Sequence, residues 1–432
     1  MRRGQSWLAR GINVYNQDGQ SQRKGMNMKI SLRIACVFAA IALWGAQAAP
    51  VHWSASWAAS QQIPEPRNAL APADLSNATL RQIVNLSLGG QQLRVHLSNA
   101  FGTAPLHIVA AHIARVVSPA GSAIVPATDT ALTFSGHSDV TIPAGAQYVS
   151  DPVTFPVPAL SNLAITLYYD TPPQQETGHP GSRSTSYLVH GDAVSAPDLP
   201  NAKTFDHWYQ ISGVDVAADA PVVAALGDSI TDGHAATTNG NDRWPDILAQ
   251  RSVVRNIGVI NEGIGGNRLL LDGLGPNALA RFDRDVLAPA GVRSVIVLEG
   301  INDLGTLTRD APASPAEHAA LVHKMIGAYE QIVLRAHAHG IKVIGATIMP
   351  DMGSDYYHPD AANEADRQAV NRWIRAPGHF DAVVDFDAVM RDPAQPDRLN
   401  PAYDSGDHLH PSPAGYAVMG KAVPLSLLAA EK

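Results

Sequence analysis

The segment PVVAALGDSITDG, residues 221–233, sets the pattern that the rest of the chain follows. Residues 221–226 are apolar without interruption, which is typical of a strand buried on both faces of a sheet. A polar turn follows directly, and a helical pattern begins at Trp244 with Pro245 in its first turn. A strand, a polar turn and a helix in this order form the repeating unit of an α/β fold.

The same alternation continues to the C-terminus. Ser412 is the expected N-cap of the last helix, and Pro413 is its expected first residue. Strands that alternate with helices predict a doubly wound parallel sheet covered on both faces. Ligands of such sheets bind at the carboxyl ends of the strands, so functional residues are expected there. The predicted strands are 292–298, 341–348 and 380–386, and the predicted helices are 244–251, 315–339, 361–375 and 412–428.

The residues before this region have a different rhythm, with short strand-like runs separated by Pro, Gly and Ser. Residues 81–88 and 91–99 flank Gly89 and Gly90, which predicts a β-hairpin with a Gly-Gly turn. Apolar residues recur with a period of two at 163, 165, 167 and 169. An all-β sandwich or jelly roll is therefore expected for residues 49–220, followed by the α/β domain at 221–432. Further short strands are predicted at 106–116, 131–134, 140–142 and 153–155.

Residues 1–48 are predicted to be a leader that contains a secretory signal peptide at about 26–48. Basic residues precede an apolar run at 34–45, and Ala-Gln-Ala at 46–48 is a typical cleavage site. An uncleaved anchor is the alternative, but a membrane-spanning helix needs about 20 apolar residues. The pattern predicts export to the periplasm or the medium, with no integral membrane segment left after cleavage.

The composition excludes several classes of protein. Of the 432 residues, 45% are hydrophobic and 16% are charged, so the chain can bury a large core and is neither disordered nor fibrous. Removal of residues 1–48 takes away seven Lys or Arg residues and one Asp, which changes the formal net charge from −8 to −14. Such an acidic chain is not expected to bind nucleic acid. The sole cysteine, Cys36, lies in the predicted signal peptide, so no disulfide is expected.

Three further polar blocks accompany GDSITDG. They are NEGIGGN at 261–267, GIND at 300–303 and DHLHP at 407–411. The glycines of the first of these do not predict a dinucleotide site, because Arg268 stands where G-x-G-x-x-G needs its third glycine. A metal site is not expected either, since the helical pair His337 and His339 point to different faces and H-E-x-x-H is absent.

A serine, a histidine and a carboxylate on loops at strand ends are the parts of nucleophilic acyl transfer, and glycine and asparagine can supply donors for an oxyanion. In order and spacing the four blocks resemble the SGNH (GDSL) hydrolase family, with Ile where the name-giving motif has Leu. The four residues that name the family match Ser229, Gly266, Asn302 and His410, and Asp407 stands at the family's D-x-x-H position.

The resemblance implies a role for each matched residue. Ser229 would be the nucleophile and His410 the general base that removes its proton. Asp407 would orient the imidazole and stabilise its protonated form. The backbone N–H groups of Ser229 and Gly266, together with the side-chain amide of Asn302, would form the oxyanion hole.

Other polar residues near these blocks have competing interpretations. His408 lies beside Asp407 but lacks the family spacing, so it is the weaker candidate for the base. Asp228 is expected to fix the nucleophile turn by local hydrogen bonds, and Asp303 either stabilises its own turn or is a solvated carboxylate. The loop that carries Asp351, Asp355, His358 and Asp360 is either solvated or lines the substrate cleft.

The resemblance also implies a fold and a function for residues 221–432: an SGNH-hydrolase, flavodoxin-like domain that cleaves carboxylic esters without metal or organic cofactor. Segments 53–57 and 98–102 resemble the β-rich N-terminal part of a secreted bacterial subgroup. The expected partner is a small-molecule or polysaccharide ester, and a carbohydrate (xylan-type) acetylesterase is an alternative of the same mechanism. A carbohydrate-binding or adhesion protein with a degenerate hydrolase half is the alternative of another class. Degeneracy would have removed one of the four blocks, and all four are present.

Overall fold

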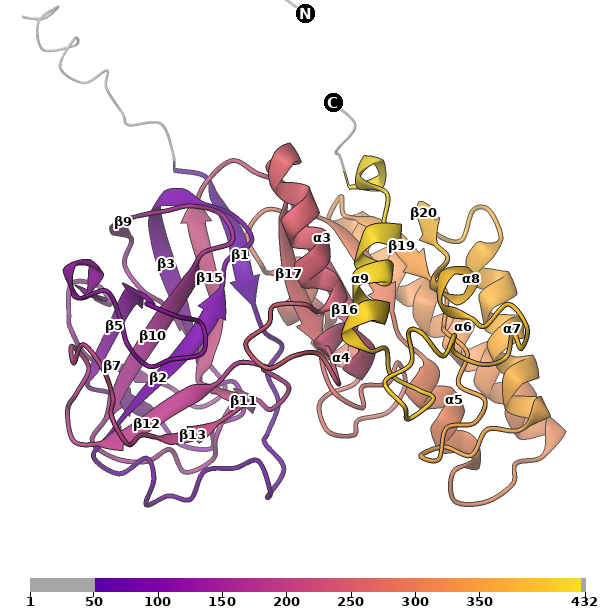
Figure 1. Cartoon of the computed structure of the whole chain (residues 1–432), viewed down its shortest axis with the longest axis horizontal. Helices are drawn as coiled ribbons and strands as arrows, with labels where there is room; N and C mark the ends of the chain where they lie inside the picture. The colour runs from indigo at the N-terminus through magenta and orange to yellow at the C-terminus, as the bar shows by residue number, and fades with distance from the viewer. Residues whose placement is uncertain (1–50, 429–432) are drawn as a thin grey trace, which may run out of the picture. The chain divides into compact units, whose positions relative to one another are not determined.

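The computed structural model describes residues 51–428 of the chain (Figure 1). The predicted leader and signal peptide, residues 1–48, lie outside the described residues. Residues from His52 onward belong to one compact unit, which contains a β-rich and an α/β portion. We call residues 53–217 the β part and residues 222–428 the α/β part. Within residues 51–428, no helix combines the length and the apolar content needed to cross a membrane.

The α/β part is built on one sheet of five parallel strands, which lie in the order β17-β16-β18-β19-β20. This is the flavodoxin-like order 2-1-3-4-5, whose topological switch point falls between the first and third strands, here β16 and β18. The predicted doubly wound parallel sheet is therefore confirmed. The strands are β16 (Val222–Gly227), β17 (Gly258–Gly263), β18 (Val292–Leu298), β19 (Lys342–Ala346) and β20 (Ala382–Val384).

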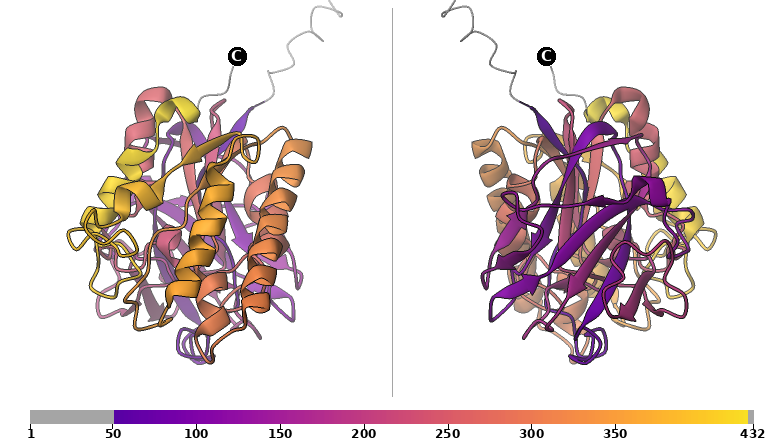
Figure 2. Two further views of the ribbon diagram at one scale, coloured as in Figure 1. Left: turned by 90° about the vertical axis from the view of Figure 1, so that its right-hand side faces the viewer. Right: turned by 90° about the vertical axis from the view of Figure 1, so that its left-hand side faces the viewer.

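Helices cover both faces of this sheet (Figures 1 and 2). Helices α3 (Trp244–Ser252) and α9 (Pro413–Ala422) pack together on one face, and α6 (Pro315–Ala338) and α7 (Ala361–Arg375) pack together on the other. The side chain of Ser412 accepts a hydrogen bond from the backbone of α9 and caps it, as predicted. The shorter helices are α2 (Ser229–Asp232), α4 (Ala278–Phe282), α5 (Ile301–Thr308) and α8 (Phe386–Met390).

Three predicted elements of the α/β part end early: the strand predicted at 341–348 stops at Ala346, and the other two stop for local reasons. The helix predicted at 412–428 stops at Ala422, because Pro424 disfavours a helical backbone at the residue before it, and Val423 is extended. The strand predicted at 380–386 is limited to β20, because the side chain of Asp385 accepts a backbone hydrogen bond and starts α8.

The β part consists mainly of two antiparallel sheets, which confirms the all-β prediction. One has the order β1-β15-β3-β8 with β9 also paired to β3, and the other has the order β13-β12-β2-β10-β5-β6. Their apolar faces share one hydrophobic cluster, as in a sandwich. The strands are β1 (Trp53–Ala58), β2 (Ala78–Asn85), β3 (Gly90–Ser98), β4 (Leu106–Ile108), β5 (Ala110–Arg115), β6 (Thr130–Ala131), β7 (Val140–Ile142), β8 (Gln147–Val149), β9 (Val153–Val157), β10 (Asn162–Tyr169), β11 (Gly178–His179), β12 (Ser186–His190), β13 (Lys203–Phe205), β14 (Trp208–Tyr209) and β15 (Ile211–Ala217).

The hairpin predicted from residues 81–88 and 91–99 is wrong. Strands β2 and β3 lie in different sheets, because β2 pairs with β10 and β12 whereas β3 pairs with β15, β8 and β9. Gly89 lies at a close approach between backbones: a Cβ there would be 2.6 Å from the carbonyl oxygen of Val157. The glycine therefore permits a crossing between two sheets rather than a two-residue turn.

Direct hydrogen bonds connect the β part to the α/β part. The Ala55 N–H on β1 donates to the carbonyl oxygen of Ala290 at 2.8 Å. The Val259 N–H on β17 donates to the hydroxyl of Ser87 at 3.0 Å. The main hydrophobic cluster also continues from the sandwich into the parallel sheet. The edge strand β17 is thus covered by the β part.

Candidate active site

Ser229 is the first residue of α2 and is separated from β16 only by Asp228. The carboxylate of Asp228 accepts a hydrogen bond from the Ile230 N–H at 2.9 Å and caps this short helix. Helix α2 packs closely on the end of β17, since a Cβ on Gly263 would lie 2.2 Å from the Asp232 nitrogen. The turn thus holds Ser229 at the carboxyl edge of the sheet, beside the β16/β18 switch point.

His410 and Asp407, from the loop before α9, meet Ser229 at this edge. The Ser229 Oγ lies 2.8 Å from His410 Nε2, and His410 Nδ1 lies 2.6 Å from Asp407 Oδ2. The other oxygen of Asp407 accepts the backbone N–H groups of Leu409 and His410. Burial alone would raise the pKa of Asp407, but the hydrogen bonds from the His410 ring and from these N–H groups hold it well below its ordinary value.

An ionised Asp407 fixes the tautomer of His410. The carboxylate can only accept, so Nδ1 carries the proton and Nε2 presents a lone pair to the Ser229 hydroxyl. The side chain of His410 is 11% exposed, whereas that of Asp407 is 43% exposed. Water therefore reaches the carboxylate more readily than the ring, and His410 is placed to accept the proton of Ser229.

Gly266 and Asn302 lie at the same cleft as Ser229. Gly266 follows β17 with a φ of 69°, in the left-handed region that favours glycine. Asn302 is the second residue of α5, which begins three residues beyond the end of β18. Within residues 51–428, the backbone N–H groups of Ser229 and Gly266 have no hydrogen-bond acceptor. Both groups are therefore free to donate to a negatively charged oxygen in the cleft.

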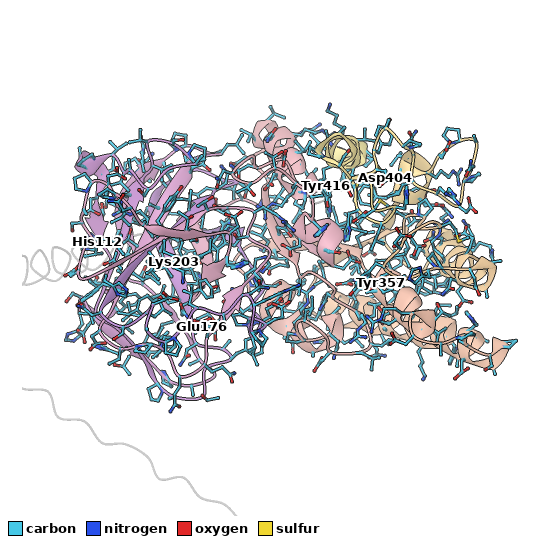
Figure 3. All side chains as sticks on the ribbon, turned by 60° about the horizontal axis from the view of Figure 1, so that its bottom comes forward. His112, Glu176, Lys203, Tyr357, Asp404 and Tyr416 are labelled. Carbon is cyan, nitrogen blue, oxygen red and sulfur yellow. The ribbon has the colours of Figure 1, made fainter. Side chains whose placement is uncertain are left out.

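Tyr357 orients the amide of Asn302. The Tyr357 hydroxyl donates to Asn302 Oδ1 at 2.6 Å, and Asn302 Nδ2 donates to the carbonyl oxygen of Asn267 at 2.8 Å. Both side chains are buried. Because the oxygen end is held by Tyr357, the nitrogen end faces the loop that carries Gly266, with its second N–H uncommitted in these contacts. In the sequence Tyr357 lies between β19 and α7. Figure 3 labels it in the α/β part.

One family model matches this part of the chain. The model of the GDSL-like Lipase/Acylhydrolase family covers residues 225–418, which include Ser229, Gly266, Asn302, Asp407 and His410. Residues 225–418 form a GDSL-like lipase/acylhydrolase domain. This GDSL-like domain extends from β16 into α9. A search of the curated proteins finds no match to the chain.

Several solved structures are similar to the GDSL-like domain. A protein described as a putative lipolytic protein of the G-D-S-L family from Desulfitobacterium hafniense is 24% identical, with 46% of this chain and 96% of that chain covered and a TM-score of 0.35. A putative acylhydrolase from Bacteroides fragilis is 24% identical, with 47% and 86% covered and a TM-score of 0.33. An acetyl xylan esterase from Geobacillus stearothermophilus is 21% identical, with 48% and 94% covered and a TM-score of 0.34.

Two buried carboxylates bind the backbone of loops in the GDSL-like domain. Asp303 accepts the N–H groups of Leu269 and Leu270 at 2.8 and 3.1 Å, so it secures the loop after Gly266 rather than its own turn. Burial raises the pKa of Asp303 to about 6 despite these donors. Burial also raises the pKa of Asp228, and the nearby charge of Asp303 raises it further. Both carboxylates therefore hold loops in place by accepting backbone hydrogen bonds.

The remaining polar candidates occupy different places. His408 pairs with Asp404 at 2.6 Å in an exposed position, whereas the Ser229 hydroxyl is bound by His410. Of the acidic loop after β19, Asp355 lines the cleft and Asp360 caps α7. Asp351 is buried instead.

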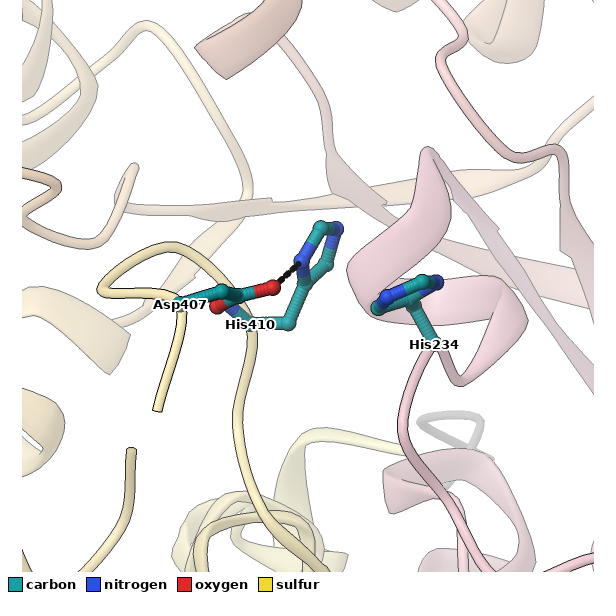
Figure 4. A group of neighbouring side chains, drawn as sticks. All are labelled: His234, Asp407 and His410. Atoms are coloured by element: carbon teal, nitrogen blue, oxygen red, sulfur yellow. Dashed lines mark hydrogen bonds and ion pairs between the residues drawn. The ribbon is translucent and has the colours of Figure 1, made fainter. Parts of the chain in front are cut away.

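His234, Asp407 and His410 bring possible metal-ligand atoms to within 4.8 Å of one another (Figure 4). Each of these residues is already engaged in a hydrogen bond. The dashed line in Figure 4 marks the Asp407–His410 bond, His410 Nε2 binds Ser229, and His234 Nδ1 lies 3.2 Å from Arg183 Nη2. A cation here would compete with the Arg183 guanidinium and with the Asp407–His410 bond. The group therefore fits a hydrogen-bond network better than a metal site.

The cleft has a volume of about 750 Å³ and is lined from both parts of the chain. The sequence predicted five of these lining residues, left Asp355 open and predicted none from the β part. The five are Ser229, Gly266, Asn302, Asp407 and His410. The missed residues of the β part lie on loops between its strands and follow no local motif. Those of the β part are Gln62, Glu65, Arg67, Asn68, Pro180, Gly181, Arg183 and His207.

Proposed function

We propose that the GDSL-like domain is a serine ester hydrolase that cleaves carboxylic esters through an acyl-enzyme. One observation carries this proposal: Ser229 Oγ lies 2.8 Å from His410 Nε2 while His410 Nδ1 lies 2.6 Å from Asp407. A serine hydroxyl is a poor nucleophile until a base removes its proton, and this chain of hydrogen bonds supplies that base.

In the proposed reaction, Ser229 Oγ attacks the ester carbonyl carbon while its proton moves to His410 Nε2. The carbonyl oxygen becomes an anion, which accepts hydrogen bonds from the N–H groups of Ser229 and Gly266 and from the amide of Asn302. Collapse of this intermediate breaks the bond to the alcohol oxygen, and His410 returns the proton to that oxygen. Water then attacks the acyl carbon while its proton moves to His410. The bond between the acyl carbon and Ser229 Oγ breaks, His410 returns the proton to Oγ, and the acid is released.

The test is Ser229→Ala. The kcat for ester cleavage is expected to fall by at least about 10⁴-fold, because the nucleophile is lost. The substitution removes only one hydroxyl group, so the fold is expected to be retained. Ser118→Ala, in an exposed turn of the β part, serves as the matched serine control and should keep wild-type activity. Undiminished cleavage by the folded Ser229→Ala protein would contradict the proposal.

The lining of the cleft favours esters of short acyl groups. Apart from Pro180, its aliphatic side chains are Leu274 and Leu409, whereas a long acyl chain gains about 0.8 kcal/mol for each CH₂ that it buries. Tyr356 is 60% exposed at the cleft, beside polar side chains, and offers an aromatic face to a sugar ring. These features support a carbohydrate acetyl ester as the second candidate substrate.

A substrate panel tests this choice. Acetyl, butyryl, octanoyl and palmitoyl esters of one chromogenic alcohol are compared with acetylated xylan, with Ser229→Ala as the background control. An optimum at acetyl together with acetate release from xylan would support the carbohydrate ester. An optimum at octanoyl or longer would contradict the short-acyl proposal.

Export is part of the same proposal. The basic residues, apolar run and Ala-Gln-Ala sequence within residues 26–48 support it. N-terminal sequencing of the protein from the periplasm or the medium is expected to begin at Ala49. A protein that stays in the cell with residues 26–48 intact would contradict it.

A further inference from the structure

The β part contributes a second histidine–carboxylate pair next to the proposed catalytic residues. His179 is the last residue of β11, and its side chain is only 3% exposed. Its ring stacks on Trp208, with the ring centroids 5.7 Å apart. His179 Nε2 lies 2.9 Å from Oδ1 of Asp232, which is the last residue of the helix that Ser229 begins. The pair therefore joins the β part to the nucleophile helix.

The hydrogen bonds of His179 determine the proton content of this pair. His179 Nδ1 lies 2.8 Å from the carbonyl oxygen of Ser60, and Nε2 faces the carboxylate of Asp232. A carbonyl oxygen and an ionised carboxylate can only accept, whereas a neutral imidazole has a single N–H. Both contacts together require one additional proton, held between the ring and the carboxylate. The buried pair is therefore neutral as a whole and hydrogen-bonded at both ends.

Asp232 also binds the loop that carries Gly265 and Gly266. Its second oxygen, Oδ2, accepts the backbone N–H of Gly265 at 3.1 Å, and Gly265 directly precedes Gly266. The carboxylate has little room to move, because a Cβ on Gly181 would lie 1.8 Å from Oδ2. Asp232 thus connects the helix of Ser229 with the loop that presents the Gly266 N–H.

We propose that His179 is a positioning residue for the oxyanion loop, supplied by the β part through Asp232. The inference rests on the proposed function, since it gives Gly266 a role as an oxyanion donor. An oxyanion donor acts on the charge that develops in the transition state, so its displacement lowers kcat more than it raises KM. A misplacement of about 1 Å can cost on the order of 10²-fold in rate.

Two amide variants of His179 separate its contacts. In His179→Asn the amide nitrogen lies near the former Nδ1, so the donor to Ser60 is kept and the donor to Asp232 is lost. In His179→Gln the amide nitrogen lies near the former Nε2, so the donor to Asp232 is kept. We expect kcat to fall about 10- to 100-fold in His179→Asn with KM within about threefold of wild type, and to stay within about fivefold of wild type in His179→Gln.

The carboxylate end is tested by Asp232→Asn. One end of the new amide is a donor, so it opposes either the donor of His179 or the Gly265 N–H, and kcat is expected to fall as in His179→Asn. This variant also carries the test if His179→Asn does not fold. His112→Asn is the matched control, because His112 pairs with Asp129 at 3.0 Å and lies far from Tyr357 (Figure 3). It should retain wild-type kcat.

The outcomes distinguish the two proposals. An active Ser229→Ala protein overturns the proposed function and the inference together. An inactive Ser229→Ala protein with wild-type kcat in folded His179→Asn and Asp232→Asn overturns the inference alone. Equal losses in His179→Asn and His179→Gln would also overturn it, because such a pattern means that the ring acts only by packing.

Discussion

Tyr357→Phe tests whether the orientation of one amide matters for the rate. The substitution removes only the hydroxyl that donates to Asn302 Oδ1 at 2.6 Å. The ring itself is retained, and it fills a tight space, since a Cβ on Gly305 would lie 2.3 Å from Tyr357 Cγ. Phenylalanine keeps this packing, so the effect on activity is separated from an effect on folding.

The magnitude follows from what the hydroxyl holds in place. Loss of a complete oxyanion donor costs about 3 to 4 kcal/mol in the barrier, which sets the expected effect of Asn302→Ala at roughly 10² to 10³-fold in kcat. Tyr357→Phe leaves the donor present but its buried Oδ1 without a partner, which costs about 1 to 2 kcal/mol. The expected loss in kcat is therefore about 5- to 30-fold, with little change in KM.

A double-mutant cycle is the assay that isolates the contact. Wild type, Tyr357→Phe, Asn302→Ala and the double variant are compared by kcat for one chromogenic acetate ester at saturating concentration. If Tyr357 acts through Asn302, adding Tyr357→Phe to Asn302→Ala should change kcat by less than about twofold. If Tyr357→Phe lowers kcat equally in the wild-type and Asn302→Ala backgrounds, Tyr357 does not act through Asn302.

Three further changes test the carboxylates of the α/β part. Asp407→Asn replaces an acceptor of His410 Nδ1–H by an amide, and kcat at pH 7 is expected to fall about 10³- to 10⁴-fold in steady-state kinetics while the melting temperature is retained. Burial raises the pKa of Asp351 to about 7, above an unfolded value of about 4, so its contribution to stability is complete below pH 4 and is lost as the pH rises through 7. Asp351→Asn should thus be more stable than wild type at pH 8, by about 1 kcal/mol or more, but not at pH 4. Denaturant titrations of both proteins at both pH values measure this. The same difference in free energy of unfolding at pH 4 and pH 8 would contradict the prediction. Arg281→Met removes the guanidinium that binds the buried Asp285 and Glu299, and the free energy of unfolding at pH 7 is expected to fall by about 3 to 5 kcal/mol, whereas an unchanged midpoint in denaturant would show that these pairs contribute nothing.

The convergence of the first three polar blocks could be predicted without knowing any contact, whereas the block at 407–411 follows helix α8 and reaches the sheet edge only in the folded structure. Parallel strands end at a common edge, so residues that follow β16, β17 and β18 must lie near one another once the sheet is recognised. The uninterrupted apolar run at 221–226 is a local signal, because a strand buried on both faces needs apolar side chains on both sides. The position of Ser229 at the sheet edge follows from this signal alone.

Element boundaries were predictable where a side chain acts on its own backbone. Ser412 caps α9 because its hydroxyl replaces a missing backbone acceptor, and this chemistry is visible in the sequence. The same reasoning, applied to Pro424 and Asp385, would have shortened the helix predicted at 412–428 and the strand predicted at 380–386. The two elements were predicted too long because the apolar periodicity was followed past Pro424 and Asp385.

The pairing of strands in the β part could not be predicted from the sequence pattern. A period of two identifies a strand and its buried face, but it carries no information on which strand lies beside it. Gly89 and Gly90 are typical of a turn, and they are equally suited to a close crossing of backbones, which is the use made of Gly89. The choice depends on how two sheets pack, and that is a property of the whole sandwich.

The α/β alternation, the sheet edge at which polar groups gather and the candidates Ser229 and His410 can all be recognised in the amino-acid sequence. The contact of Tyr357 with Asn302, and that of His179 with Asp232 across 53 residues of sequence, become visible only in the folded molecule. The two kinds of interaction differ in how far apart in the sequence the interacting residues lie. Backbone hydrogen bonding and burial act on neighbouring residues and leave a periodic trace, whereas a contact between distant side chains exists only after the sheets have packed and leaves no local pattern.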